Sequence, residues 1–232
     1  MYLRNPKTKG SGIVCAIPQT GVCPIGCADC FFQSGRSYLE PLGANLPNLP
    51  PQELADRRVV RVNDGNDSNV DRDKVIKDTE YCGHRFFNTS IPTLKFPAPV
   101  VLTLNPADMT DVKFHKVRAR KNLMFVRFRT NLWNLPLLYQ AIEYYSKQQV
   151  TLVITWMAYH EQSSIPIEHQ YQYDYKQRTT NSYWVVGEEI SDEIAREFVT
   201  EPYVDICCTN GSCQRCGVCL REYWRSIVRM GK

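Results

Sequence analysis

Three cysteines near the start of the chain have a spacing that suits a metal cluster. Cys23, Cys27 and Cys30 follow one another as C-x3-C-x2-C within the segment GVCPIGCADCFF. Three thiolates on one short loop can hold three irons of a 4Fe–4S cube, which leaves the fourth iron without a protein ligand. An open position on a metal is a place for chemistry, as in catalytic zinc sites. Pro24 and Gly26 favour a sharp turn that wraps the loop around a compact group.

This spacing resembles the signature of the radical S-adenosylmethionine superfamily. The resemblance implies that Cys23, Cys27 and Cys30 bind a 4Fe–4S cluster, and that the amino and carboxylate groups of S-adenosylmethionine chelate the open iron. It implies further that an electron from a reducing partner, such as flavodoxin or ferredoxin, breaks the sulfonium C–S bond. The resulting 5′-deoxyadenosyl radical then abstracts hydrogen from a substrate that the sequence leaves open. The family usually has an aromatic residue directly before the third cysteine, where this chain has Asp29.

Zinc is the alternative occupant of this first cysteine loop. A structural zinc site takes four protein ligands, and Cys15 would supply the fourth. A closed cluster and isolated reactive thiols are further interpretations of the same residues.

A second group of cysteines lies near the other end of the chain, with the spacing C-C-x4-C-x2-C-x2-C. Cys213, Cys216 and Cys219, together with Cys207 or Cys208, supply four ligands, which suffice for a closed 4Fe–4S cluster or a tetrahedral zinc. Two consecutive x2 steps favour an iron–sulfur cube over the paired knuckles of a zinc ribbon. Some radical S-adenosylmethionine enzymes carry auxiliary clusters near their C-termini, although with other spacings. We therefore predict an auxiliary cluster or zinc here.

Polar residues that follow the predicted strands are candidates to bind S-adenosylmethionine. In the radical S-adenosylmethionine superfamily that this chain resembles, a glycine-rich acidic stretch after the second strand binds the methionine amino group. Residues 64–67 follow the second predicted strand in this chain. An arginine that faces a barrel lumen can hold a carboxylate bidentately. The predicted cofactor-binding residues are Asp64, Gly65, Asn66, Asp67, Asn105, Arg127, Arg129 and Thr130. A plain polar turn at 64–67 and a solvated edge strand at 123–128 are the alternatives.

Strand and helix signals alternate along the chain. Runs of β-branched and aromatic residues predict strands at 12–17, 58–63, 100–104, 123–128, 150–156 and 183–186. Apolar spacing and caps predict helices at 51–56, 71–80, 136–147, 192–199 (with Ser191 as N-cap) and 221–230. We therefore predict an α/β fold: a partial (β/α) barrel of about five or six mostly parallel strands, with a small cysteine-rich C-terminal extension. Ligands bind at the carboxyl ends of the strands in such folds.

The length and composition fit this organisation. The 232 residues suit a radical S-adenosylmethionine-like partial barrel over residues 1–200 and a cluster-binding extension over residues 201–232. The net charge of +4 is too weak to argue for nucleic acid. No apolar run approaches the roughly 20 residues of a membrane span, and the start of the chain lacks a signal-peptide core. We expect a cytoplasmic protein without a membrane partner, in which the ten cysteines serve metals rather than disulfides.

These residues predict a radical S-adenosylmethionine enzyme. The alternative is a non-enzymatic zinc- or cluster-binding module for a protein or nucleic-acid partner, and a two-cluster electron carrier is a third possibility.

Overall fold

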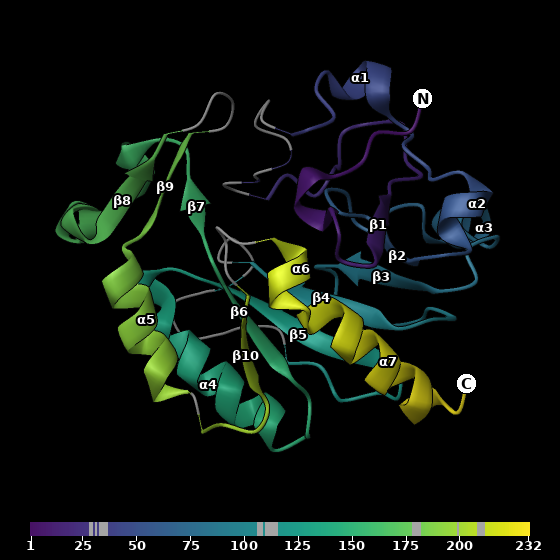
Figure 1. The fold of residues 1–232 in the computed structure, drawn as a ribbon. Helices are drawn as coiled ribbons and strands as arrows, with labels where there is room; N and C mark the ends of the chain where they lie inside the picture. Colours follow the sequence, from purple (N-terminus) through teal and green to yellow (C-terminus); the bar gives the residue numbers. More distant parts are fainter. Residues whose placement is uncertain are drawn as a thin grey trace.

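A curled sheet of seven parallel strands forms the centre of the molecule (Figure 1). The computed structural model describes residues 1–27, 30, 32, 37–105, 109, 116–177, 182–198, 200–207 and 212–232. The strands pair in the order β1-β2-β3-β4-β5-β6-β10, which follows their order along the chain. They are β1 Ile13–Ala16, β2 Val59–Val62, β3 Arg85–Thr89, β4 Val100–Leu104, β5 Leu123–Thr130, β6 Leu152–Trp156 and β10 Val204–Cys207. The predicted α/β partial barrel is confirmed.

Helices connect and cover the strands. They are α1 Leu42–Asn45, α2 Gln52–Ala55, α3 Arg72–Asp78, α4 Leu135–Ser146, α5 Glu188–Glu197, α6 Cys213–Cys216 and α7 Val218–Met230. Short 3-10 turns span Pro6–Thr8, Leu132–Asn134, Gln162–Ser164 and Ile167–Gln172. In the part of the chain that the structure describes, no helix is long and apolar enough to cross a membrane.

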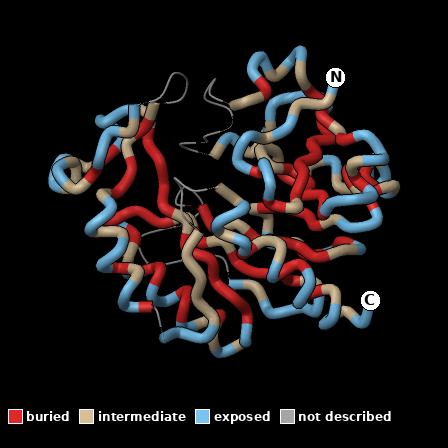
Figure 2. Tube along the Cα trace, in the orientation of Figure 1, coloured by how far each residue is buried: buried red, intermediate tan, exposed pale blue. Residues whose placement is uncertain are grey.

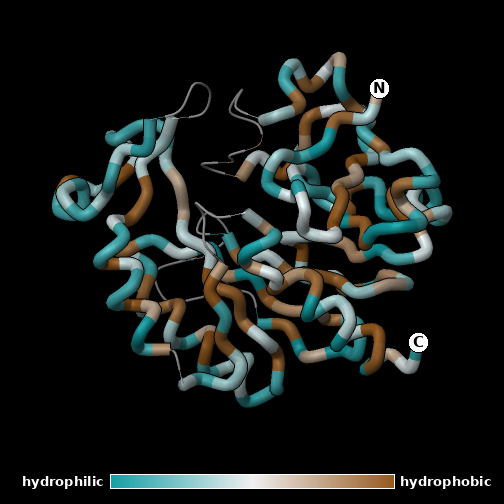
Figure 3. The backbone as a smooth tube through the Cα atoms, in the orientation of Figure 1, coloured by the Kyte–Doolittle hydropathy of each residue, from teal (hydrophilic) through white to brown (hydrophobic). Residues whose placement is uncertain are grey.

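The alternation of side chains along the strands divides the core into two hydrophobic clusters. On the outer face of the sheet, residues such as Val62 and Val126 pack with helices α2 to α5. On the inner face, Phe125 and its neighbours pack with Val218 and Tyr223 of α7. Figure 2 shows that the strands are mostly buried, and Figure 3 shows that hydrophobic residues concentrate there. Helix α7 therefore covers the inner face of the sheet.

Five strands differ from the sequence-based expectation, and two of them, β7 (Ala158–Tyr159) and β8 (Tyr173–Lys176), are unpredicted strands of the small second sheet. β3 and β10 were not predicted and bring the parallel sheet to seven strands among the described residues. The predicted strand at 183–186 forms as β9 (Tyr183–Val186), but it pairs antiparallel with β7 (Ala158–Tyr159) and β8 (Tyr173–Lys176) in a separate small sheet. Its alternation of apolar residues is the same in either kind of sheet, so local pattern does not select the partner strand.

The start of α5 also differs from the prediction. The helix begins at Glu188 after Gly187, and Ser191 lies inside it rather than at the N-cap. The Ser191 hydroxyl donates to the Glu188 carbonyl oxygen at 2.9 Å. Glu188 and Glu189 occupy the first turn, where their charges interact favourably with the helix dipole.

The C-terminal residues complete the body of the molecule. β10 pairs with β6 as the last strand of the parallel sheet, and α7 packs across the inner face against β5 (Figure 1). Glu222 on α7 is buried, and it accepts hydrogen bonds from Arg225 at 2.7 Å and from Thr151 at 3.3 Å. Residues 201–232 thus supply both a strand and the helix that covers the inner face.

Candidate metal and cofactor site

The first cysteine loop lies at the carboxyl end of the parallel strands. It follows β1, and its three cysteines, Cys23, Cys27 and Cys30, are all half-buried. The Cys30 backbone N–H donates to the Cys27 carbonyl oxygen at 3.3 Å, which makes a tight turn between the last two thiols. The loop therefore lies where this class of fold binds its ligands.

The loop that follows β2 supports the cysteine loop. Gly65 has φ +147°, and a Cβ atom placed there would lie 2.2 Å from a ring carbon of Phe32. The Asn66 amide donates to the Gly21 carbonyl oxygen at 3.3 Å. Glycine is therefore required at position 65 both by its backbone conformation and by the close approach of Phe32.

Backbone N–H groups reach the first thiol of the motif. Burial raises the pKa of Cys23, while N–H groups of Ile25 and Asp67 donate to its sulfur and oppose this shift. Hydrogen bonds to cysteine sulfurs are one of the ways in which proteins tune iron–sulfur clusters. The residues after β2 thus contact a predicted metal ligand through the backbone.

The Asp67 carboxylate is buried and holds the ends of β2 and β3 together. Its Oδ1 accepts from the Asn69 backbone N–H at 2.8 Å and from the Thr89 hydroxyl at 2.7 Å. Its Oδ2 accepts from the Ser90 backbone N–H at 2.6 Å and from the Ser90 hydroxyl at 3.1 Å. Two carboxylate oxygens offer about four acceptor positions, and all are used here. The structure thus places Asp67, a predicted cofactor contact, in the scaffold of the site.

Asp64 belongs to a polar network beneath the cysteine loop that the sequence analysis did not anticipate. Its Oδ2 lies 2.8 Å from Arg61 Nη2 and 3.3 Å from Cys15 Sγ, and it also accepts from the Asn5 amide. In the sequence, this network is indicated by Arg61, a charged residue within the otherwise apolar strand Val59–Val62. Oδ1 of Asp64 has no contact of this kind with a described residue, so it can accept from a ligand.

Cys15, the alternative fourth zinc ligand, lies in this network rather than on the cysteine loop. It is fully buried on the inner face of β1, and Arg61 Nη2 lies 3.5 Å from its sulfur. Burial raises the pKa of Cys15, so the thiol form is favoured. Arg61 experiences a different balance: burial disfavours its charge, but the Asp64 carboxylate, 2.8 Å away, outweighs burial and raises the pKa of Arg61.

Arg129 and Asn105 extend toward the cysteine loop from the ends of β5 and β4. The Asn105 amide nitrogen lies 3.9 Å from Cys27 Sγ. Burial lowers the pKa of Arg129, and the nearby Arg127 lowers it further, whereas Cys30 and Cys27 act in the opposite direction. No described carboxylate forms an ion pair with Arg129. An arginine in this position suits an anionic ligand next to the thiols.

The two remaining predicted residues of β5 lie in different surroundings. The Arg127 guanidinium lies over the Phe125 ring at 5.7 Å and contacts the Thr103 hydroxyl at 3.5 Å, one inward-facing position before Arg129. Thr130 is fully buried, and its hydroxyl donates to the Asn134 side chain at 2.7 Å next to the capped turn that precedes α4. Thr130 therefore acts as scaffold in this structure.

The second cysteine group lies on the inner face. Cys207 ends β10, Cys213 and Cys216 are the first and last residues of α6, and Cys219 lies in the first turn of α7. The sulfurs of Cys207 and Cys216 are 3.7 Å apart. The hydrogen bond between these two thiols lowers the pKa of Cys216 and raises the pKa of Cys207. Cys208 falls outside the described residues.

The donor set of the first loop fits an iron–sulfur cluster. Three half-buried thiols come from one turn, with backbone N–H donors and an arginine beside them. Thiolates are the ligands of such clusters, and their negative charge is stabilised by donors and cations around the sulfurs. Within the described ranges, no three His, Cys, Asp or Glu side chains gather closely enough to ligate a single ion.

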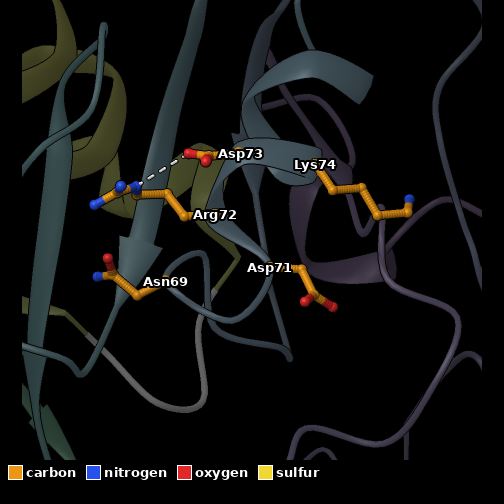
Figure 4. Close-up of a pocket in the computed structure, with 5 residues that line it drawn as sticks. All are labelled: Asn69, Asp71, Arg72, Asp73 and Lys74. Carbon is orange, nitrogen blue, oxygen red and sulfur yellow. Dashed lines mark ion pairs between the residues drawn. The ribbon is translucent and has the colours of Figure 1, made fainter.

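An open groove of about 680 Å³ lies at the start of α3 (Figure 4). Its lining includes Asn69, Asp71 and Lys74, together with Arg72 and Asp73, which pair at 3.5 Å. None of these lining residues was predicted to bind metal or cofactor.

Comparison with known proteins gives one structural similarity. No protein-family model matches the chain, and no curated protein matches it significantly in sequence. Among solved structures, the chain is similar to a spore photoproduct lyase mutant with bound AdoMet and dinucleoside spore photoproduct. The sequence identity is 11%, the match covers 85% of this chain and 83% of that chain, and the TM-score is 0.44.

Proposed function

We propose that this chain is a radical S-adenosylmethionine enzyme that binds a 4Fe–4S cluster through Cys23, Cys27 and Cys30. The proposal is carried by one observation: the three half-buried thiols of the C-x3-C-x2-C loop lie at the carboxyl edge of a parallel partial barrel, beside Arg129, which forms no ion pair with a carboxylate of the described residues. When bound, the cluster supplies the electron that splits the sulfonium C–S bond and thereby starts hydrogen abstraction from a substrate. A reducing partner of the flavodoxin or ferredoxin type delivers that electron.

The chain's own contribution at the thiols is to hold the loop in shape. Phe32 packs on Gly65, and the N–H groups of Ile25 and Asp67 donate to the Cys23 sulfur. These contacts fix the loop, and with it the three thiols that would hold a cluster, to the end of β2. Positioning of this kind is what a protein adds to a reactive cofactor.

Two charged groups are arranged to hold the amino-acid part of S-adenosylmethionine. Arg129 lies close to Cys27 and Cys30 and can bind the carboxylate through two parallel N–H donors. Asp64 Oδ1 can accept from the ammonium group, since the contacts of this carboxylate with described residues all use Oδ2. The Asn105 side-chain amide nitrogen lies 3.9 Å from the Cys27 sulfur.

The test uses protein purified without oxygen, with iron and zinc counted per chain. The protein is then incubated with dithionite and S-adenosylmethionine, and release of 5′-deoxyadenosine is measured. We expect iron-dependent release that Cys27→Ala abolishes. Cys82→Ala is the matched control, because Cys82 is a buried cysteine of the outer core, away from both cysteine groups. Release at the parental rate from Cys27→Ala would refute the proposed site.

The same measurement distinguishes the alternative functions. A colourless protein that contains zinc and does not cleave S-adenosylmethionine would support a non-enzymatic zinc module. A reducible iron–sulfur protein that releases no 5′-deoxyadenosine would support an electron carrier.

A further inference from the structure

The inner face of the sheet changes from apolar to polar between two successive rows of side chains. The first row packs with α7 in the inner hydrophobic cluster, and its members on β1 to β6 are Ile13, Val59, Phe86, Val101, Phe125 and Val153. Because side chains alternate along a strand, the next inward row lies two residues further toward the carboxyl edge. We call it the polar row, and its members are Cys15, Arg61, Asn88, Thr103, Arg127 and Thr155. A row of this composition suits contact with a ligand rather than a packed core.

Three members of the polar row have buried atoms without a hydrogen-bond partner. Asn88 is 6% exposed, and its amide donates to the Val62 carbonyl oxygen at 3.1 Å, but its Oδ1 has no partner. The Thr155 hydroxyl and Arg61 Nε are buried in the same way. A buried polar atom that stays unpaired costs about 1–3 kcal/mol. These atoms therefore indicate that a polar ligand completes the hydrogen bonding of the row.

Arg127 gives the polar row a positive charge without a counter-ion. Its guanidinium lies 3.5 Å from the Thr103 hydroxyl and 5.7 Å from the centre of the Phe125 ring, and both groups are neutral. No carboxylate of the described residues lies within ion-pair distance of Arg127, whereas Arg61 pairs with Asp64. A cation held inside the barrel without a carboxylate partner favours the binding of an anion.

The neighbouring arginine shows that this anion belongs to a second molecule. Arg129 is the next inward residue of β5, and the positive charge of Arg127 acts on it. S-adenosylmethionine carries one anionic group, its carboxylate, which the proposed function places at Arg129. Arg127 lies one inward position deeper, so its anion comes from a molecule that binds next to the cofactor.

We propose that the polar row binds the anionic group of the substrate, a carboxylate or a phosphate, through Arg127. The planar guanidinium binds either anion through two parallel N–H donors. Asn88 Oδ1 and the Thr155 hydroxyl accept from N–H or O–H groups of the same molecule, so the substrate is a polar anion that also carries hydrogen-bond donors. This inference rests on the proposed function, because it names the substrate class of that site.

The test titrates inorganic phosphate and succinate separately into full-length protein, by calorimetry, without oxygen and without reductant. An excess of S-adenosylmethionine fills the site proposed at Arg129, so the remaining heat reports a second anion site. We expect Arg127→Gln to weaken binding of the better probe about tenfold or more, because the charge-assisted hydrogen bonds are lost. The better probe shows whether the site prefers phosphate or carboxylate. Arg120→Gln is the matched control, because Arg120 is exposed before β5, and it should change the affinity less than about twofold.

Parental affinity in Arg127→Gln, or no binding of either probe to the parental protein, would overturn the inference. Release of 5′-deoxyadenosine, measured as above, judges the proposed function separately. Probe binding through Arg127 without that release would refute the proposed function and keep the anion site. Release without probe binding would keep the proposed function and refute the anion site.

Thr155→Val tests the polar row without removing a charge. Because the hydroxyl has no partner, a methyl group of similar size should leave the urea unfolding midpoint unchanged or raise it. The same substitution should weaken probe binding about fivefold, since it removes one hydrogen bond to the ligand. A lower midpoint with parental probe affinity would show that the hydroxyl stabilises the fold and does not contact the ligand.

Discussion

Replacing Asp67 with asparagine should destabilise the whole protein rather than only weaken cofactor binding. The carboxylate is 4% exposed and receives four hydrogen bonds, two on each oxygen. Asparagine keeps one acceptor oxygen and places an NH2 group where the other oxygen was. If the amide oxygen keeps Asn69 and Thr89, the NH2 group meets the Ser90 backbone N–H, and that donor is left without a partner.

The size of the effect follows from these contacts. A buried donor left unsatisfied costs about 1–3 kcal/mol, and hydrogen bonds to a charged acceptor contribute about 1.5–3 kcal/mol each. The Ser90 hydroxyl can rotate and recover one bond, so we expect a loss of about 3 kcal/mol in the free energy of unfolding for Asp67→Asn. With a urea slope of about 3 kcal/mol/M for a chain of this size, the unfolding midpoint should fall by about 1 M.

The measurement is urea unfolding without oxygen, together with the affinity for S-adenosylmethionine at low urea. Asp73→Asn is the matched control, because the Asp73 side chain is 92% exposed and its pair with Arg72 is long at 3.5 Å. It should change the unfolding free energy by less than about 0.5 kcal/mol. An Asp67→Asn protein with the parental midpoint but with weakened cofactor binding would show that this carboxylate serves the ligand, contrary to our reasoning.

Two further perturbations test the supports of the site. Gly65→Ala should lower the iron bound by the first loop and cost about 2–4 kcal/mol, because it combines an unfavourable φ with a collision against Phe32; adding Phe32→Ala should restore part of the stability, and no recovery would contradict the contact. Glu222→Gln should cost about 1–3 kcal/mol in thermal or urea unfolding, since it leaves Arg221 and Arg225 without their buried charge partner, whereas an unchanged midpoint would show that this carboxylate does not stabilise the packing of α7.

Several features of this protein could be predicted because they depend on local pattern. Runs such as Val59–Val62 are rich in β-branched residues and are buried, and a strand pattern of this kind is visible without the rest of the fold. The first cysteine loop was also placed correctly after the first strand. Ligand type and spacing are properties of the chain itself, so the two cysteine groups and the thiol chemistry they allow follow from sequence alone.

Only the tertiary structure decided how distant groups combine. Asp67 was a reasonable ligand candidate by its position in the sequence. In the structure, however, Thr89 and Ser90 at the end of β3 donate hydrogen bonds to its carboxylate oxygens. The role of Arg61 depends on the fold, because β2 places its side chain next to Cys15 and near the C-terminal cysteines. β10 joined the parallel sheet through pairing with β6, more than forty residues earlier in the chain. Hydrogen-bond satisfaction and charge compensation depend on what surrounds a residue in space, and a local pattern does not contain that information.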